Sequence, residues 1–179
     1  MVRVLSAAVL AAALAGAPPA LAQTTTPAGA MPGTASSGLT DLDRQFMVLD
    51  ATGGVYEISL ATLAQERSSR DDIKAYAAML IRDHAEYNGA LQQLARSKGV
   101  TLPTGISPDD RTKLNGINLQ GGSTFDRSFI LEAIRINEED KKAAMDEAAA
   151  TSDPDIKAFL QKYAAMDARH EQAARALQR

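Results

Sequence analysis

The sequence has no cysteine, no tryptophan, only two histidines and few aromatic residues. Without cysteine the chain forms no disulfide, has no thiol nucleophile and cannot carry the lipid anchor of a bacterial lipoprotein. The patterns G-x-S-x-G and H-E-x-x-H and a phosphate-binding loop are also absent. These absences favour a non-enzymatic protein.

Charge of one sign is not concentrated anywhere in the chain. Lysine and arginine number 19 and aspartate and glutamate 22, for a formal net charge of −3. No basic cluster with interleaved aromatic residues is present, so we expect no nucleic-acid partner.

The first 22 residues have the pattern of a secretory signal peptide. Arg3 precedes an apolar run over residues 4–16, and Ala20-Leu21-Ala22 forms a small-residue cleavage site. Residues 23–39 are rich in Thr, Pro, Gly, Ala and Ser, and we expect a disordered linker there. No later stretch predicts an integral membrane segment, so we expect a periplasmic or secreted protein.

Residues 40–178 predict an all-α fold. Apolar residues recur at steps of three and four, which is typical of helices with one buried face. We expect long helices over 40–67, 69–99, 123–150 and 154–177, and a short one from Ser107 to about Asn115. This pattern predicts an antiparallel four-helix bundle, ferritin-like, with a long connection between the second and third long helices.

Several residues predict where helices begin and end. Thr40 with Asp43, and Ser69 with Asp72, are candidate N-terminal caps. Gly99 is a candidate C-terminal residue in the left-handed conformation. Gly53-Gly54 interrupts the first helix and predicts a kink, a close approach of another helix, or room for a group bound beside Glu57.

Four polar residues lie on the stripes expected to face inward. They are Glu57, His84, Asn137 and His170, one on each long helix. Counting from the helix ends places them near a common level of the bundle. Glu57, His84 and His170 are therefore candidate ligands for a divalent transition metal. Candidate residues to orient the imidazole rings are Asp83, Asp140, Asp167 and Glu171.

Other roles for these residues stay open. A buried polar layer that fixes helix register needs no ligand. The di-iron bundles use Glu-x-x-His pairs, and the nearest match here is Asp167-x-x-His170. A haem held by His84 and His170 is a further alternative, although the few aromatic residues argue against a wide apolar pocket.

Parts of the chain resemble the bacterial secreted family called domain of unknown function 4142. The resemblance rests on GGVYEISLATLA (53–64), Asp83-His84, Leu102-Pro103, Phe125-Asp126 and His170. It implies a ferritin-like fold, often in proteins with membrane or outer-membrane labels, and no settled activity. An envelope protein is therefore a candidate partner.

The chain departs from the family pattern at one position. The family usually has a histidine in the third long helix about a dozen residues after Phe-Asp, where this chain has Asn137. Asparagine is a weaker metal ligand than histidine. The departure favours a structural polar layer over a metal site.

Overall fold

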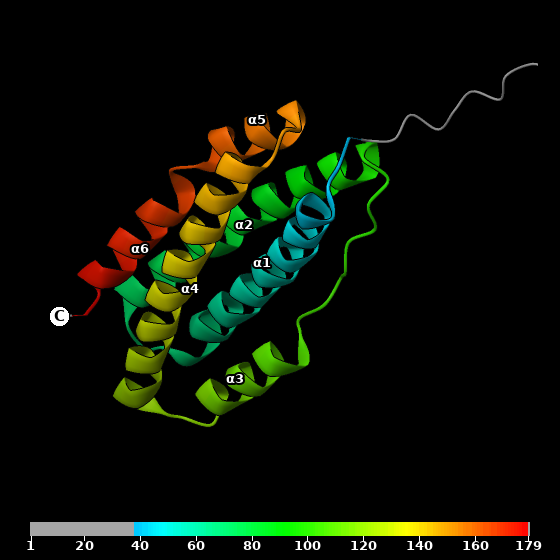
Figure 1. Cartoon of the computed structure of the whole chain (residues 1–179). Helices are drawn as coiled ribbons and strands as arrows, with labels where there is room; N and C mark the ends of the chain where they lie inside the picture. The colour runs from blue at the N-terminus through cyan, green and yellow to red at the C-terminus, as the bar shows by residue number, and fades with distance from the viewer. Residues whose placement is uncertain (1–37, 179) are drawn as a thin grey trace, which may run out of the picture. The chain divides into compact units, whose positions relative to one another are not determined.

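Six α-helices make up most of residues 38–178, the part of the chain that the computed structural model describes (Figure 1). They are α1 (Asp41–Arg67), α2 (Asp71–Ser97), α3 (Pro108–Asn118), α4 (Gly122–Ala150), α5 (Pro154–Tyr163) and α6 (Met166–Ala176). No strand occurs within these residues, so the predicted all-α class is confirmed. The predicted signal peptide (1–22) and the predicted linker up to residue 37 lie outside the described part.

Four helical columns form the bundle. α1 packs against α2 and α4, while α5 and α6 together form the fourth column and pack against both α4 and α2. Residues 98–121 join α2 to α4, and α3 within this segment packs on α1 and α4 (Figure 1). None of the described helices has an apolar stretch long enough to cross a membrane.

The fourth long helix is broken, which corrects the prediction of one helix over 154–177. Ala164 and Ala165 form a turn between α5 and α6. Both residues keep dihedral angles close to helical values (φ −50°, ψ −25° and φ −96°, ψ −4°). The same face therefore stays buried on both sides of the turn, and the periodicity of the sequence shows no interruption.

The capping predictions have mixed outcomes. Thr40 and Asp43 form the predicted capping box, and Gly99 has a positive φ of 69°. Ser69 does not cap α2. The N-cap residue is Arg70, whose guanidinium binds the Asp72 carboxylate at 2.7 and 3.1 Å. The turn between α1 and α2 is only three residues long, and Ser69 lies on its surface. Arg70 binds the Asp72 carboxylate, which the predicted capping box with Ser69 would have used.

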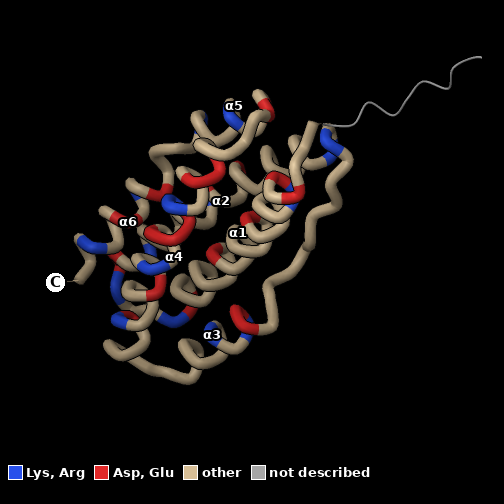
Figure 2. Tube along the Cα trace, in the orientation of Figure 1, with Lys and Arg blue, Asp and Glu red and all other residues tan. Residues whose placement is uncertain are grey.

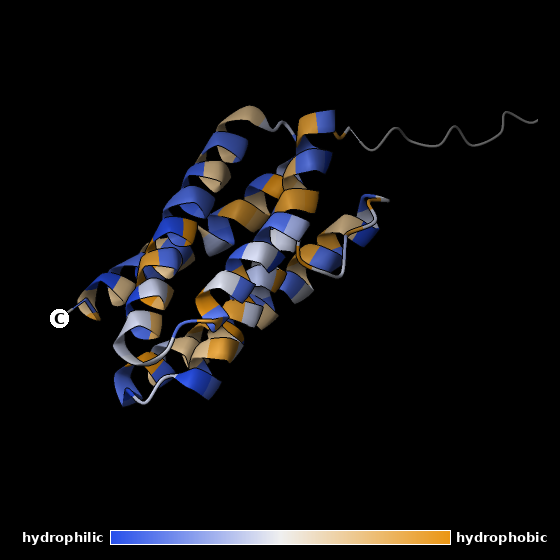
Figure 3. Ribbon diagram, turned by 90° about the horizontal axis from the view of Figure 1, so that it is seen from below, coloured by the Kyte–Doolittle hydropathy of each residue, from blue (hydrophilic) through white to orange (hydrophobic). Residues whose placement is uncertain are grey.

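Two hydrophobic clusters fill the bundle, one toward each end. The first contains Tyr56, Leu80, Phe129 and Ala174, and the second contains Met47, Leu91, Ile156 and Met166. Hydrophilic and hydrophobic residues are interspersed along each helix (Figure 3), and acidic and basic residues are distributed over all the helices (Figure 2). In every column, residues of the first cluster lie on one side of the middle and residues of the second cluster lie on the other side.

The first half of α1 buries a different face from the predicted one. The three- and four-residue spacing of Phe46, Leu49 and Leu60 predicts Leu49 on the buried face, but its side chain is 62% exposed. Asp43, Met47 and Ala51 are buried instead. The prediction followed the large apolar residues, whereas the interior accepts acidic side chains here. α1 also continues unbroken through Gly53 and Gly54, and Gly54 admits Asn88 of α2 at close range.

Candidate functional site

A layer of polar residues separates the two hydrophobic clusters. We call Glu57 of α1, His84 of α2, Asn137 of α4 and His170 of α6 the polar layer. Their exposed fractions are 1%, 3%, 0% and 0%. The prediction that these four residues face inward is confirmed, and each lies at the point on its helix where one cluster gives way to the other.

Glu57 is the centre of this layer. Its Oε1 lies 3.2 Å from Nε2 of His84. Its Oε2 accepts a hydrogen bond of 3.3 Å from the Asn137 side-chain amide, which also donates to the Ala133 carbonyl oxygen at 2.8 Å. The carboxyl group of α1 therefore contacts both α2 and α4.

His170 engages a different carboxylate. Its Nε2 lies 3.1 Å from Oδ2 of Asp83, the residue before His84. The rings of His84 and His170 have centroids 5.3 Å apart and are tilted by 46°. The structure thus brings the predicted ligands Glu57, His84 and His170 into one layer, but His170 interacts with Asp83 rather than with Glu57.

Further acidic residues surround a small cavity next to the polar layer. This acidic cavity has a volume of about 10 Å³ and is lined by Asp50, Glu57, His84, Asp140 and Asp167, together with Gly54, Tyr87, Ala144 and Met166. The Tyr87 hydroxyl donates to Oδ2 of Asp50 at 2.6 Å. Sequence reasoning missed Asp50, although it precedes Glu57 by seven residues and so lies on the same face of α1.

Burial keeps the acidic cavity close to neutral. Burial raises the pKa of Asp50 to about 8, and burial and the nearby Asp167 charge raise the pKa of Glu57 to about 8. Burial also raises the pKa of Asp167 to about 6 and that of Asp140 well above its usual value. Burial lowers the pKa of His84 and so favours its neutral imidazole, the form that binds a metal ion.

The arrangement of these side chains can be compared with what the two ligands considered from the sequence, a metal ion and a haem, would need. Within residues 38–178, no group of three or more His, Asp or Glu side chains lies in an arrangement that could hold a metal ion. The acidic cavity has room for about one water-sized sphere, which does not accommodate a haem.

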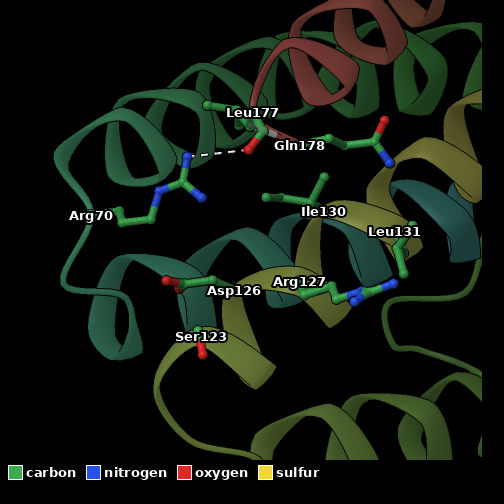
Figure 4. A pocket seen from close by; sticks show the side chains of 8 residues that line it. All are labelled: Arg70, Ser123, Asp126, Arg127, Ile130, Leu131, Leu177 and Gln178. Carbon is green, nitrogen blue, oxygen red and sulfur yellow. Dashed lines mark hydrogen bonds between the residues drawn. The ribbon is translucent and has the colours of Figure 1, made fainter.

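A second, larger pocket lies at the end of the bundle where the α1–α2 turn, α4 and the end of α6 meet. Its volume is about 450 Å³, and Arg70, Asp126, Arg127 and Leu177 are among the residues that line it (Figure 4). Arg70 donates across it to the Leu177 carbonyl oxygen at 3.1 Å. The pocket shares no lining residue with the acidic cavity.

The chain belongs to the family named Domain of unknown function (DUF4142), which matches residues 28–177. A solved structure with a similar fold is the crystal structure of a DUF305 fragment from Deinococcus radiodurans. It is 14% identical, has a TM-score of 0.69, and the match covers 77% of this chain and 95% of that one. At this identity the likeness shows the fold alone. No curated protein is detectably similar to this chain.

Proposed function

We propose that this chain is an exported, non-enzymatic bundle protein of the bacterial envelope, periplasmic or secreted, with ferritin-like topology. The signal-like residues 1–22 support export. The joining of α2 to α4 through residues 98–121 supports the ferritin-like topology.

One observation carries the non-enzymatic role. Contacts at the polar layer connect all four columns of the bundle: Glu57–His84 joins α1 to α2, Glu57–Asn137 joins α1 to α4, and Asp83–His170 joins α2 to α6. The Glu57–Asn137 and Asp83–His170 hydrogen bonds would be lost if the helices slid along one another, so they favour one helix register. The adjacent cavity of about 10 Å³ has no space for an organic substrate.

Export is tested by fractionation. The full chain, produced in a Gram-negative host, is expected in the periplasm or the medium with the mass of residues 23–179. A version lacking residues 1–22 is the matched control and is expected in the cytoplasm. Recovery of the full-length mass from the cytoplasm would contradict the proposal.

The register role is tested by Asn137→Ala. The substitution leaves Oε2 of Glu57 without its amide partner, and we expect a loss of about 1–3 kcal/mol in the free energy of unfolding. The neighbouring Glu138→Ala changes an exposed residue and is expected to cost less than about 0.5 kcal/mol. Equal effects of the two substitutions would show that the layer does not stabilise the bundle.

Metal binding through Glu57, His84 and His170 is the second candidate function. The observation in its favour is that two buried imidazole rings lie 5.3 Å apart, with one of them 3.2 Å from a buried carboxylate. His170 would have to leave Asp83 to join the other two residues.

A further inference from the structure

We propose that the acidic cavity binds one divalent first-row transition metal ion through the carboxylates of Asp50, Glu57, Asp140 and Asp167 and the imidazole of His84. This set shares Glu57 and His84 with the set expected from the sequence, but it excludes His170. The proposal goes beyond the structural role of the polar layer and does not depend on export.

The first observation is convergence. The five side chains come from α1, α2, α4 and α6, so every column of the bundle contributes to one cavity. Its volume of about 10 Å³ is close to the space that one water molecule needs. The cavity therefore fits a single ion and no larger ligand.

The second observation is that buried polar atoms at this cavity lack hydrogen-bond partners. Among the described residues, neither Nδ1 of His84 nor Oε1 of Glu57 has one. Oε1 of Glu57 lies 3.2 Å from Nε2 of His84, but the contact does not have hydrogen-bond geometry. Both side chains are at least 97% buried. Buried polar atoms nearly always have partners in native proteins, so both atoms are available to bind an ion in the cavity.

The third observation is charge. Four carboxyl groups line the cavity, and no lysine or arginine is among its lining residues. The nearby Lys141 is engaged by Glu171 on the outside. Without a cation these carboxyl groups stay close to neutral by holding protons, and a divalent ion would balance their charge when those protons are released.

The ligand types indicate the class of ion. Four carboxylates and one imidazole suit manganese, iron or zinc in the divalent state better than copper(I), which prefers sulfur ligands. The thioether of Met166 also lines the cavity, but it packs in the second hydrophobic cluster. Tyr87 holds one oxygen of Asp50 and so limits the rotation of that carboxyl group.

Binding requires the acidic side chains to move from their present positions. The carboxyl groups of Glu57 and Asp140 interact directly with each other. As they now lie, no three of these described side chains could hold a metal ion together. Binding then requires rotation of these carboxyl groups toward the cavity centre and release of any proton that they carry to the solvent.

The test is calorimetric titration of chelator-treated protein with Mn²⁺ and Zn²⁺ separately. We expect one ion per chain for at least one of them, and a melting temperature raised by about 5 °C at saturation. Absence of stoichiometric binding for both ions would overturn the proposal. Co²⁺ provides a second readout, because its visible spectrum reports coordination by protein ligands.

Matched variants test the ligand set. Asp50→Asn and Asp140→Asn keep the size of the side chain and are expected to weaken binding by about tenfold or more, with circular dichroism confirming the fold. Asp146→Asn, on the exposed side of α4, is the control and is expected to bind like the wild type. His170→Gln is also expected to retain binding. Loss of binding in His170→Gln, or unchanged binding in Asp50→Asn, would overturn this ligand set. Neither result would bear on the fractionation test of export.

Discussion

The side-chain amide of Asn88 on α2 occupies the place where a side chain at Gly54 on α1 would begin. A Cβ at position 54 would lie 2.1 Å from Oδ1 of Asn88 and 2.9 Å from its Cγ. These distances are far below van der Waals contact. The glycine therefore leaves room for the Asn88 side chain between α1 and α2 beside the acidic cavity.

Gly54→Ala makes the Asn88 side-chain amide rotate away, and because this amide is the end of a flexible side chain we expect its movement to offset the gain of about 1 kcal/mol in helix propensity, leaving stability within about 0.5 kcal/mol of the wild type. Urea unfolding measures the change. Gly89→Ala is the control, since a Cβ there meets nothing within 4 Å, and it is expected to raise stability by about 0.5–1 kcal/mol. If Gly54→Ala were as stabilising as Gly89→Ala, the movement of Asn88 would offset nothing.

His170 is expected to stay neutral in metal-free protein down to about pH 5. Burial lowers its pKa to about 4, although Asp83 acts in the opposite direction. Because the folded-state pKa is depressed, the unfolded chain binds this proton first, and the contribution of His170 to stability falls as the pH drops from 6.5 to 4. With only two histidines in the chain, NMR can follow both rings. A midpoint near 6.5 for His170 would contradict its burial.

Asp153 is expected to be important for the start of α5. Its carboxylate accepts hydrogen bonds from the backbone N–H groups of Asp155 and Ile156 at 2.9 and 3.1 Å, and it binds Nζ of Lys98 at 2.6 Å. Asp153→Ala should cost about 1–3 kcal/mol, since it removes both the cap and a partly buried ion pair. Thermal unfolding measures the loss.

Asp155→Ala is the control for Asp153→Ala. Asp155 also binds Lys98 at 2.6 Å, but its side chain is 65% exposed, so we expect a loss below about 0.5 kcal/mol. Equal losses from the two substitutions would mean that the cap hydrogen bonds contribute little.

Glu147 is expected to make stability depend on pH. Burial and the neighbouring Asp43 raise the pKa of Glu147 to about 7. Burial acts to raise the pKa of Asp43 too, but hydrogen bonds with Thr151, Glu147 and Thr40 lower it to about 2. The protonated form of Glu147 therefore fits the fold, and its stabilisation is complete below pH 4.5 and is lost as the pH rises to about 7.

Glu147→Gln removes this titration. Unfolding free energies at pH 5 and pH 8 should differ by about 1–3 kcal/mol less in this variant than in the wild type. Glu139→Gln, an exposed change on the same helix, should leave the difference unchanged. An unaltered pH dependence in Glu147→Gln would contradict the shifted pKa.

The sequence predicted those features that depend on helical periodicity. The spacing placed Glu57, His84, Asn137 and His170 on inward faces, and all four are buried. It did not reveal Asp50, because an acidic residue on an amphipathic helix is normally assigned to the solvent face. The pairing of His170 with Asp83 also depends on how α2 and α6 pack, which single-helix patterns do not determine.

Helix ends were predicted correctly where a single residue caps or starts the helix. They were predicted less well where a neighbouring side chain binds the same capping group. Thr40 caps α1, and Pro108 and Pro154 begin α3 and α5. Ser69 failed as a cap because Arg70 takes the Asp72 carboxylate. The turn at Ala164 and Ala165 has no proline or glycine, and the apolar spacing continues through it, so the sequence carries no sign of the break.

The turn between α5 and α6 makes the last eleven-residue helix a separate unit of local opening. A short helix that is held only by packing contacts with its neighbours can open locally while the other helices stay folded. Detachment of α6 would expose Asp167 and separate His170 from Asp83, admitting water to the interior. Amide hydrogen exchange should therefore be faster in α6 than in α1 or α2, and the rate of this opening would limit how fast an ion enters or leaves the bundle.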